Sequence, residues 1–356
     1  MERNFSLPKE KMVFLLLFVF CLVVTIFASF ALPEKFYGDS KIIAFDRFHE
    51  AGLFGSYPLN ITFYKITGLK HLPFFVIAIL QLSICFYLIK KIGIPKDFHV
   101  VNTKNLVTYI FFLLLAVFIS MPTKEFLNFI FIYYLLFLIV NPKKKLKKKF
   151  VLSVIALVLF GIFYRTYYVM MPIIAAGMYL ISKLEVQNKT IATIFYGILI
   201  MASLSITYGF LKGEYISSKQ REELNQTRTK NNNSAIESPV DTKTWYGETI
   251  GLFYGFVAVN FPLTELRHIF SPQIIAFVVW QLFLFYILFV RFSKLIYSNK
   301  FTKEMWLFLI MFSFFIVQAV FEPDLGSAIR HKIGILPIIF YCLHYEKLKS
   351  NTPKSI

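Results

Sequence analysis

The chain has 356 residues, of which 57% are hydrophobic, 19% aromatic and only 16% charged. This composition excludes an ordinary soluble domain, in which about a quarter of the residues are charged. The formal net charge of +18 raises the possibility of a nucleic-acid-binding protein, but the distribution of the basic residues argues for membrane topology instead. Cys21, Cys85 and Cys342 all lie inside apolar runs, so a disulfide framework or a cysteine metal site is not expected.

Apolar runs recur along the chain, and each is close to the roughly 20 residues that a helix needs to cross a bilayer. They predict an all-α polytopic membrane protein that forms a single integral membrane domain over residues 1–356. The first run is longer than the apolar core of a signal peptide, so we expect a retained anchor. The ten predicted spans are 12–32, 72–90, 105–121, 125–141, 150–164, 168–183, 190–211, 272–290, 305–321 and 333–346.

The basic residues predict the orientation of these spans. With the N-terminus inside, more than half of the 38 Lys and Arg residues lie in the inner segments, and most of the acidic residues lie in the outer ones. The lysine run at 143–149 is the plainest marker, and it is typical of an anchor against anionic lipid. Both termini are therefore predicted to be cytoplasmic.

Two outer loops are long: residues 33–71 and residues 212–271. Within the second, residues 247–262 are apolar but short and interrupted by glycine, and counting them as a crossing would place the basic residues after span eight on the outer side. We therefore interpret them as a re-entrant or surface-lying piece. Residues 212–246 are polar and predict a mobile segment or lid rather than a second domain.

The most unusual polar cluster lies between the last two spans, at residues 321–332. It contains Glu322, Asp324, Arg330 and His331 around a proline and a glycine. Ionisable groups beside membrane spans are costly unless they sit at a water boundary and carry a function. This segment therefore predicts a site at the outer face.

Three further polar clusters fall on the same predicted face, in the first outer loop and in the two short outer turns. Each has a plainer explanation: an ordinary loop, a tight helical hairpin, or an interfacial aromatic belt with a snorkelling arginine. Their agreement on one face favours a site. Their residues are Asp39, Lys124, Glu125, Tyr164, Arg165 and Tyr167.

The residue types in these clusters favour glycosyl transfer from a lipid-linked pyrophosphate. Arginine binds phosphate through a planar, permanently charged fork. A carboxylate can deprotonate a sugar hydroxyl as it attacks an anomeric carbon. The sequence contains no glycine-rich phosphate loop, His-Glu-x-x-His motif or Asp-x-Asp pair, so we expect neither a metal nor a cofactor.

With these residues the chain resembles the bacterial polysaccharide-repeat polymerases, namely the Wzy-type O-antigen and capsule polymerases and their EpsG-like relatives. The resemblance also covers the length, the span count and the large late outer loop, and so nearly the whole chain. In one departure, no second Arg-x-Gly-type loop stands out within residues 212–246, which leaves that loop without an assigned role. The motifs that carry the resemblance are Gly38-Asp39-Ser40, Pro122-Thr123-Lys124-Glu125, Tyr164-Arg165-Thr166-Tyr167 and the segment from Glu322 to Pro337.

The resemblance implies a GT-C-like helical enzyme of the bacterial inner membrane whose active face is periplasmic. Such an enzyme transfers the growing glycan from undecaprenyl pyrophosphate to the non-reducing end of a fresh lipid-linked repeat unit, without a metal. The expected partners are the lipid-linked oligosaccharide, the membrane itself, a flippase and a chain-length regulator. No nucleic acid is expected.

The chemistry of the site residues and the family resemblance together predict a role for each residue. Arg165 and Arg330, with His331 or Lys124, would hold the donor pyrophosphate, and Glu125 would orient Lys124. The tyrosines that flank Arg165 would support it.

One carboxylate, either Asp39, Glu322 or Asp324, would act as the base for the acceptor hydroxyl. Two other functions stay open: a different lipid-linked glycosyltransferase that builds the repeat unit, and a flippase for the same lipid. A flippase would carry charges along a path near the bilayer midplane and often shows repeated halves. Spans two to four and nine to ten have apolar centres and the chain has no internal repeat, so these features favour the transferase.

Overall fold

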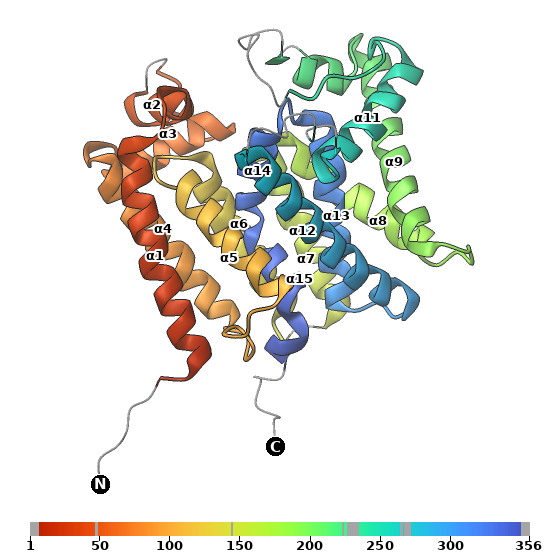
Figure 1. The fold of residues 1–356 in the computed structure, drawn as a ribbon. Helices are drawn as coiled ribbons and strands as arrows, with labels where there is room; N and C mark the ends of the chain where they lie inside the picture. Colours follow the sequence, from red (N-terminus) through yellow and green to blue (C-terminus); the bar gives the residue numbers. More distant parts are fainter. Residues whose placement is uncertain are drawn as a thin grey trace. The chain divides into compact units, whose positions relative to one another are not determined.

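The computed structural model describes residues 7–46, 49–143, 145–222, 224–225, 235–263, 266 and 272–349. The regular elements of these residues are all helical, and their β pairing is limited to a single bridge between Ala235 and Asp324. The α-helices are α1 (Lys9–Ala31), α2 (Gly38–Phe45), α3 (Ser56–Ile66), α4 (Phe74–Ile92), α5 (Thr103–Phe118), α6 (Lys124–Val140), α7 (Leu146–Phe163), α8 (Met170–Ile181), α9 (Lys189–Lys212), α11 (Trp245–Asn260), α12 (Pro272–Tyr297), α13 (Lys303–Phe321), α14 (Leu325–Gly334) and α15 (Leu336–Lys349) (Figure 1). The described residues also form short helical segments: η1 (Glu34–Tyr37), η2 (Leu69–His71), η3 (Thr166–Val169) and the π-helical η4 (Ser218–Glu222).

Every predicted span coincides with a helix, in the order α1, α4, α5, α6, α7, α8, α9, α12, α13 and α15. Five helices among the described residues, α1, α4, α9, α12 and α13, are long and apolar enough to cross a membrane. The helical fold with membrane-spanning character is thereby confirmed, while the ten-span topology stays a prediction. The predicted re-entrant or surface-lying piece at 247–262 is largely helical, as α11. Residues 226–234 and 267–271 of the large outer loop lie outside the described residues.

The helix ends follow local sequence signals. Pro8 and Pro73 directly precede α1 and α4, where the missing N–H of proline costs no helical hydrogen bond. The side chain of Asn102 caps α5 by accepting the N–H of Asn105 at 2.9 Å. At the other end of a span, Gly213 ends α9 with a φ of 81°, a left-handed conformation that favours glycine.

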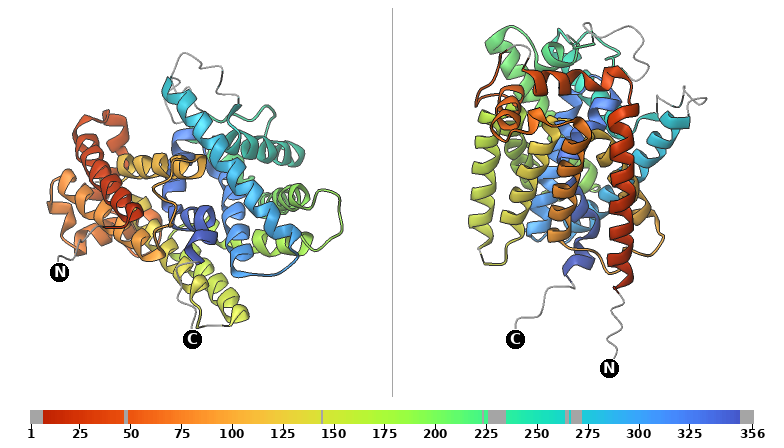
Figure 2. Two further views of the ribbon diagram at one scale, coloured as in Figure 1. Left: turned by 60° about the horizontal axis from the view of Figure 1, so that its bottom comes forward. Right: turned by 90° about the vertical axis from the view of Figure 1, so that its left-hand side faces the viewer.

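The chain divides into two compact units. Unit 1 comprises residues Met1–Phe137 and Ile333–Ile356, and unit 2 comprises Leu138–Lys332. In unit 1, α1 packs against α4 and α5, and α15 packs against α4. Figure 2 shows α2 and α3 lying across the C-terminal end of α1, where Tyr37 donates a hydrogen bond of 2.9 Å to the carbonyl of Ser29.

A buried polar network ties together the helix ends of unit 1 on the predicted outer side. Tyr64 is fully buried, and its hydroxyl donates to Oε1 of Gln81 at 2.6 Å while accepting the backbone N–H of Thr123 at 3.2 Å. The amide nitrogen of Gln81 donates in turn to the carbonyl of Met121 at 3.2 Å. The network therefore fixes the turn that precedes α6, because it satisfies backbone groups that would otherwise be buried without partners.

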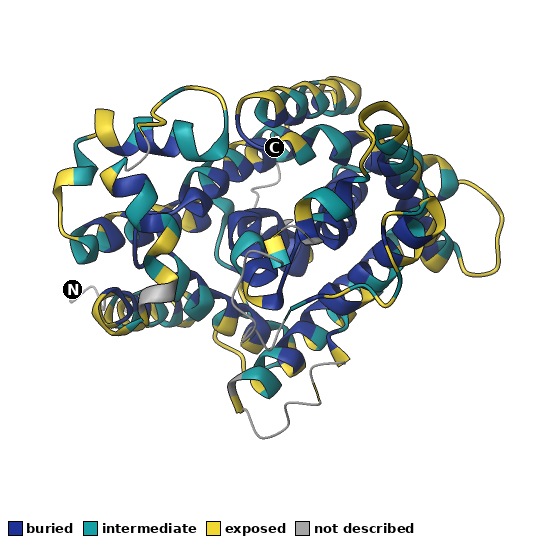
Figure 3. Cartoon of the chain, turned by 90° about the horizontal axis from the view of Figure 1, so that it is seen from above, coloured by how far each residue is buried: buried dark blue, intermediate teal, exposed yellow. Residues whose placement is uncertain are grey.

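Unit 2 is organised around α13. Most helices are buried on one side and exposed on the other (Figure 3), whereas every residue of α13 from Glu304 to Val320 is buried. A helix that is apolar all round is expected to be enclosed by protein or lipid, and α13 packs against α8, α9, α11 and α12. The indole N–H of Trp306 donates to Oγ of Ser153 at 2.8 Å, which satisfies the polar atom of the largest side chain in this helix.

We expect Tyr64→Phe to destabilise the protein by about 1–3 kcal/mol, because it leaves Gln81 and the N–H of Thr123 buried without their shared partner. The measurement is the apparent melting temperature in detergent. Tyr286→Phe is the matched control, since Tyr286 is 65% exposed on α12. Equal melting temperatures for the two variants would contradict the structural role of the network.

Candidate functional site

The segment that the sequence singled out forms a tightly paired dyad in unit 2. Nδ1 of His331 lies 2.6 Å from Oε1 of Glu322, and the side chains are 19% and 2% exposed respectively. The amide of Gln318, one turn earlier on α13, donates to the same oxygen at 3.1 Å. An ionised carboxylate can only accept, so Nδ1 of His331 is the donor of this pair.

Pro323 creates the break that brings these residues together. It cannot continue α13, and it restricts Glu322 to extended backbone (φ −82°, ψ 117°). Asp324 then caps α14: its carboxylate accepts the N–H of Ser327 at 2.8 Å and the hydroxyl of Ser327 at 3.1 Å. Asp324 is therefore engaged in starting the helix that carries His331.

The Tyr-Arg-Thr-Tyr motif lies at the same end of unit 2. Nη1 of Arg165 donates to the hydroxyl of Tyr167 at 2.9 Å, and the guanidinium carbon lies 5.5 Å from the ring centre of Tyr164. The ring of Tyr167 contacts that of Phe321, the last residue of α13, with centroids 5.5 Å apart. An arginine of fixed geometry thus lies close in space to the helix end that carries Glu322. Arg330 is half-buried directly before His331.

The remaining predicted residues lie in unit 1. Nζ of Lys124 lies 3.2 Å from Oδ2 of Asp39 and 3.6 Å from the ring centre of Tyr57, and the hydroxyl of Tyr57 donates to Asp39 at 2.7 Å. Glu125 is buried beside Asn128, whose amide lies 3.5 Å from its carboxylate. Asp39 and Lys124, predicted as base and phosphate ligand, are therefore paired with each other.

Several buried ionisable groups of unit 2 were not predicted as site residues, among them Glu248 and Lys332. Glu248 on α11 is fully buried and accepts hydrogen bonds from the hydroxyl of Ser205 (2.5 Å), from the N–H of Ser217 (3.2 Å) and from the hydroxyl of Ser217. It thereby fastens the chain that follows α9 onto α11. The acid lies in an apolar run among glycines, and only its presence there could have signalled this role.

Lys332 is the second missed group. It is fully buried, with Nζ 3.5 Å from the carbonyl of Val259 and 5.6 Å from the ring centre of Phe315. Burial lowers the pKa of Lys332 from 10.5 to about 7, although the carboxylate of Glu322 opposes the shift. The amine of Lys332, the residue after His331, therefore loses its proton close to neutral pH.

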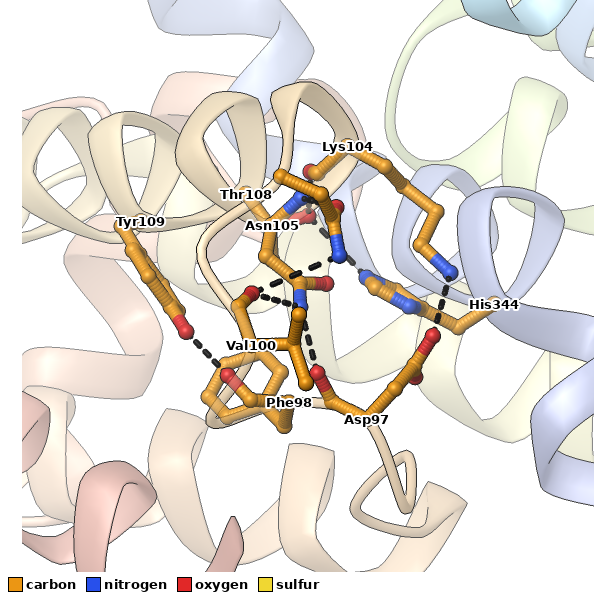
Figure 4. Close-up of polar contacts among 9 residues, drawn as sticks. Asp97, Phe98, Val100, Lys104, Asn105, Thr108, Tyr109 and His344 are labelled. Atoms are coloured by element: carbon orange, nitrogen blue, oxygen red, sulfur yellow. Dashed lines mark hydrogen bonds and ion pairs between the residues drawn. The ribbon is translucent and has the colours of Figure 1, made fainter.

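The end of unit 1 on the predicted inner side carries its own polar network (Figure 4). The amide of Asn105 donates to the carbonyls of Asp97 (2.7 Å) and Val100 (2.8 Å), which holds the loop before α5. Nε2 of His344 on α15 lies 3.0 Å from the hydroxyl of Thr108. The contact between Thr108 and His344 ties α15 to α5.

Searches of family models, curated proteins and solved structures found no match for this chain. The family resemblance therefore stays a prediction. Within the described ranges, no three His, Cys, Asp or Glu side chains gather as a metal site would require.

We expect Lys332 to make stability depend on pH. The folded chain releases this proton at about pH 7 and the unfolded chain only near pH 10.5, so rising pH stabilises the folded state across that window. Lys332→Met should flatten the rise in melting temperature between pH 7 and pH 10. The exposed Lys65→Met should keep it, and an unchanged slope in Lys332→Met would contradict the assignment.

Proposed function

We propose that the protein is a glycosyltransferase that polymerises lipid-linked oligosaccharide repeat units. The observation that carries the proposal is the pair between Nδ1 of His331 and Oε1 of Glu322 at 2.6 Å. A histidine whose one nitrogen is held by a buried carboxylate presents its other nitrogen as a general base. Arginines near such a base suit a substrate that carries both a hydroxyl and a pyrophosphate.

In the proposed reaction, Nε2 of His331 accepts the proton of the acceptor sugar hydroxyl as the oxygen attacks the anomeric carbon of the donor. A new glycosidic C–O bond forms, the C–O bond to the pyrophosphate breaks, and undecaprenyl pyrophosphate leaves with the electron pair. Glu322 holds the ring in the required tautomer and stabilises the imidazolium that results. Glu322 is favoured over Asp39 and Asp324 as the working carboxylate, because Asp39 pairs with Lys124 and Asp324 caps α14.

Arg165 and Arg330 would bind the donor pyrophosphate and stabilise the charge that develops on it. Two tyrosine rings beside Arg165 limit its motion, so its donors are held in place before the substrate arrives. Lys124 stays a candidate phosphate ligand, which would require it to exchange Asp39 for the substrate. Glu125 would then orient Lys124.

The proposal includes the setting that the family resemblance implies. The enzyme would lie in the bacterial inner membrane with its active face in the periplasm, and it would require no cofactor. It would receive its substrate after a flippase has moved the lipid across the membrane, and a chain-length regulator would determine product size. The helical membrane character of the chain supports this setting.

The dyad is tested in the natural host, with the gene deleted and replaced by variants. Glu322→Gln and His331→Gln should each lower the polymerisation rate about 10²–10⁴-fold, because they remove the base or its orienting partner. The polysaccharide ladder on a gel should collapse to a single repeat unit. Glu237→Gln, at an exposed acid of the outer loop, should give the wild-type ladder.

The same gel separates the alternatives. Loss of every repeat unit, including the first, would place the protein upstream, as a flippase or as a transferase that builds the unit. A wild-type ladder from both dyad variants would overturn the proposed chemistry.

Arg165 gives an independent prediction. Arg165→Ala should lower kcat by about 10²–10³-fold with purified protein in liposomes that contain lipid-linked repeat units, because charge on the leaving pyrophosphate loses a donor. Arg165→Lys should recover only part of the rate, since lysine lacks the planar fork. Lys212→Ala, at an exposed basic residue at the end of α9, is the control. Equal rates for Arg165→Ala and Lys212→Ala would remove Arg165 from the site.

A further inference from the structure

The C-terminal turn of α13 has a gap in its hydrogen bonding. In a continuing helix the carbonyl of Ala319 would accept the N–H of residue 323, but Pro323 has no N–H. Nη1 of Arg221 occupies this position instead and donates to the carbonyl of Ala319 at 2.9 Å. The same nitrogen donates to the carbonyl of Gly251 on α11 at 3.3 Å.

The glycines of α11 provide the space for this guanidinium. A Cβ atom at Gly255 would lie 2.6 Å from Nη1 of Arg221 and 2.4 Å from the carbonyl oxygen of Ala319. A Cβ atom at Gly251 would lie 3.3 Å from Nη2. Any other residue at Gly255 would therefore push the arginine and the end of α13 apart, which gives the glycine-interrupted sequence of this helix a structural reason.

The outer loop 212–246, which contains Arg221, makes a second contact just after Glu322. The N–H of Ile236 donates to the carbonyl of Pro323 at 2.8 Å, and Ile236 is itself buried. Arg221 and Ile236 thus hold the backbone three residues before Glu322 and one residue after it. Arg221 is fully buried, so it acts on this turn rather than on substrate.

We propose that Arg221 is a positioning residue, through which the outer loop 212–246 holds Glu322 against His331. The expected effect of Arg221 on the reaction rate rests on the proposed function, whereas its expected effect on the Glu322–His331 contact does not. Without Arg221 the carbonyl of Ala319 loses its charged donor, the last turn of α13 loosens, and the 2.6 Å contact of the dyad lengthens. Arg221 and Ile236 of this loop, to which the sequence assigned no role, therefore support the backbone on either side of Glu322.

The catalytic test compares Arg221→Met, Arg221→Lys and the control Lys219→Met, whose exposed side chain pairs only with Glu214 among the described contacts. Arg221→Met should lower kcat by about 10²-fold and leave KM close to wild type, because small displacements of a catalytic group affect the chemical step. Arg221→Lys should recover part of the rate, since its amine can still reach a carbonyl. A folded Arg221→Met protein with wild-type kcat would overturn the proposal.

A spectroscopic readout does not depend on activity. In protein labelled with ¹⁵N in the histidine rings, the Nδ1–H of His331 should give a downfield proton signal, assigned by its loss in His331→Gln. The signal should be absent in Glu322→Gln and in Arg221→Met, and present in Lys219→Met. If Arg221→Met does not fold, Arg221→Lys and Gly255→Ala decide instead: weakened signals support the proposal and unchanged signals overturn it.

The two readouts keep the proposals separate. If Glu322→Gln and His331→Gln polymerise normally, the proposed function has failed, and the signal alone decides whether Arg221 positions the pair. If both dyad variants are inactive while Arg221→Met keeps the signal and the rate, only the role of Arg221 has failed.

Discussion

The end of α13 depends on one backbone constraint, the missing N–H of Pro323. It ends a helix that is buried from Glu304 to Val320, turns Glu322 into extended backbone, and leaves the carbonyl of Ala319 without its helical donor. The start of α14 and the contact with His331 follow from that turn. The guanidinium of Arg221 and the N–H of Ile236 compensate for the break.

Burying charged groups at this end of unit 2 costs free energy, and each group is stabilised in a different way. Glu322 receives hydrogen bonds from His331 and Gln318, and Arg221 donates to backbone carbonyls. Lys332 has one distant carbonyl and an aromatic ring, and it responds with a lowered pKa. Burial without a close counter-ion favours the neutral form of an amine, whereas arginine stays charged and must be bonded. Such an accumulation of buried ionisable groups is typical of a functional site.

The predicted site residues fall into two groups that play different parts. Asp39 and Lys124 form an ion pair stacked on Tyr57 that holds α2 to the start of α6 in unit 1. Glu322 and His331 form a dyad in which the carboxylate is buried and the imidazole is more exposed. The proposed reaction uses Nε2 of His331, the ring nitrogen that does not face Glu322. The proposed function therefore rests on unit 2.

The sequence by itself determined the helices, while the common outer face of the polar clusters stays a prediction. Apolar runs of membrane-crossing length need no partner to be recognised, because their helices satisfy their own backbone groups, and proline and capping residues mark their ends locally. It also identified Glu322, His331 and Arg165 from their unusual place beside spans. Only the tertiary structure decided which of these residues meet, that Asp324 is a cap, and that Arg221, Glu248 and Lys332 are buried. Those facts depend on contacts between residues as far apart in the chain as Arg221 and Ala319, and no local pattern encodes such a contact.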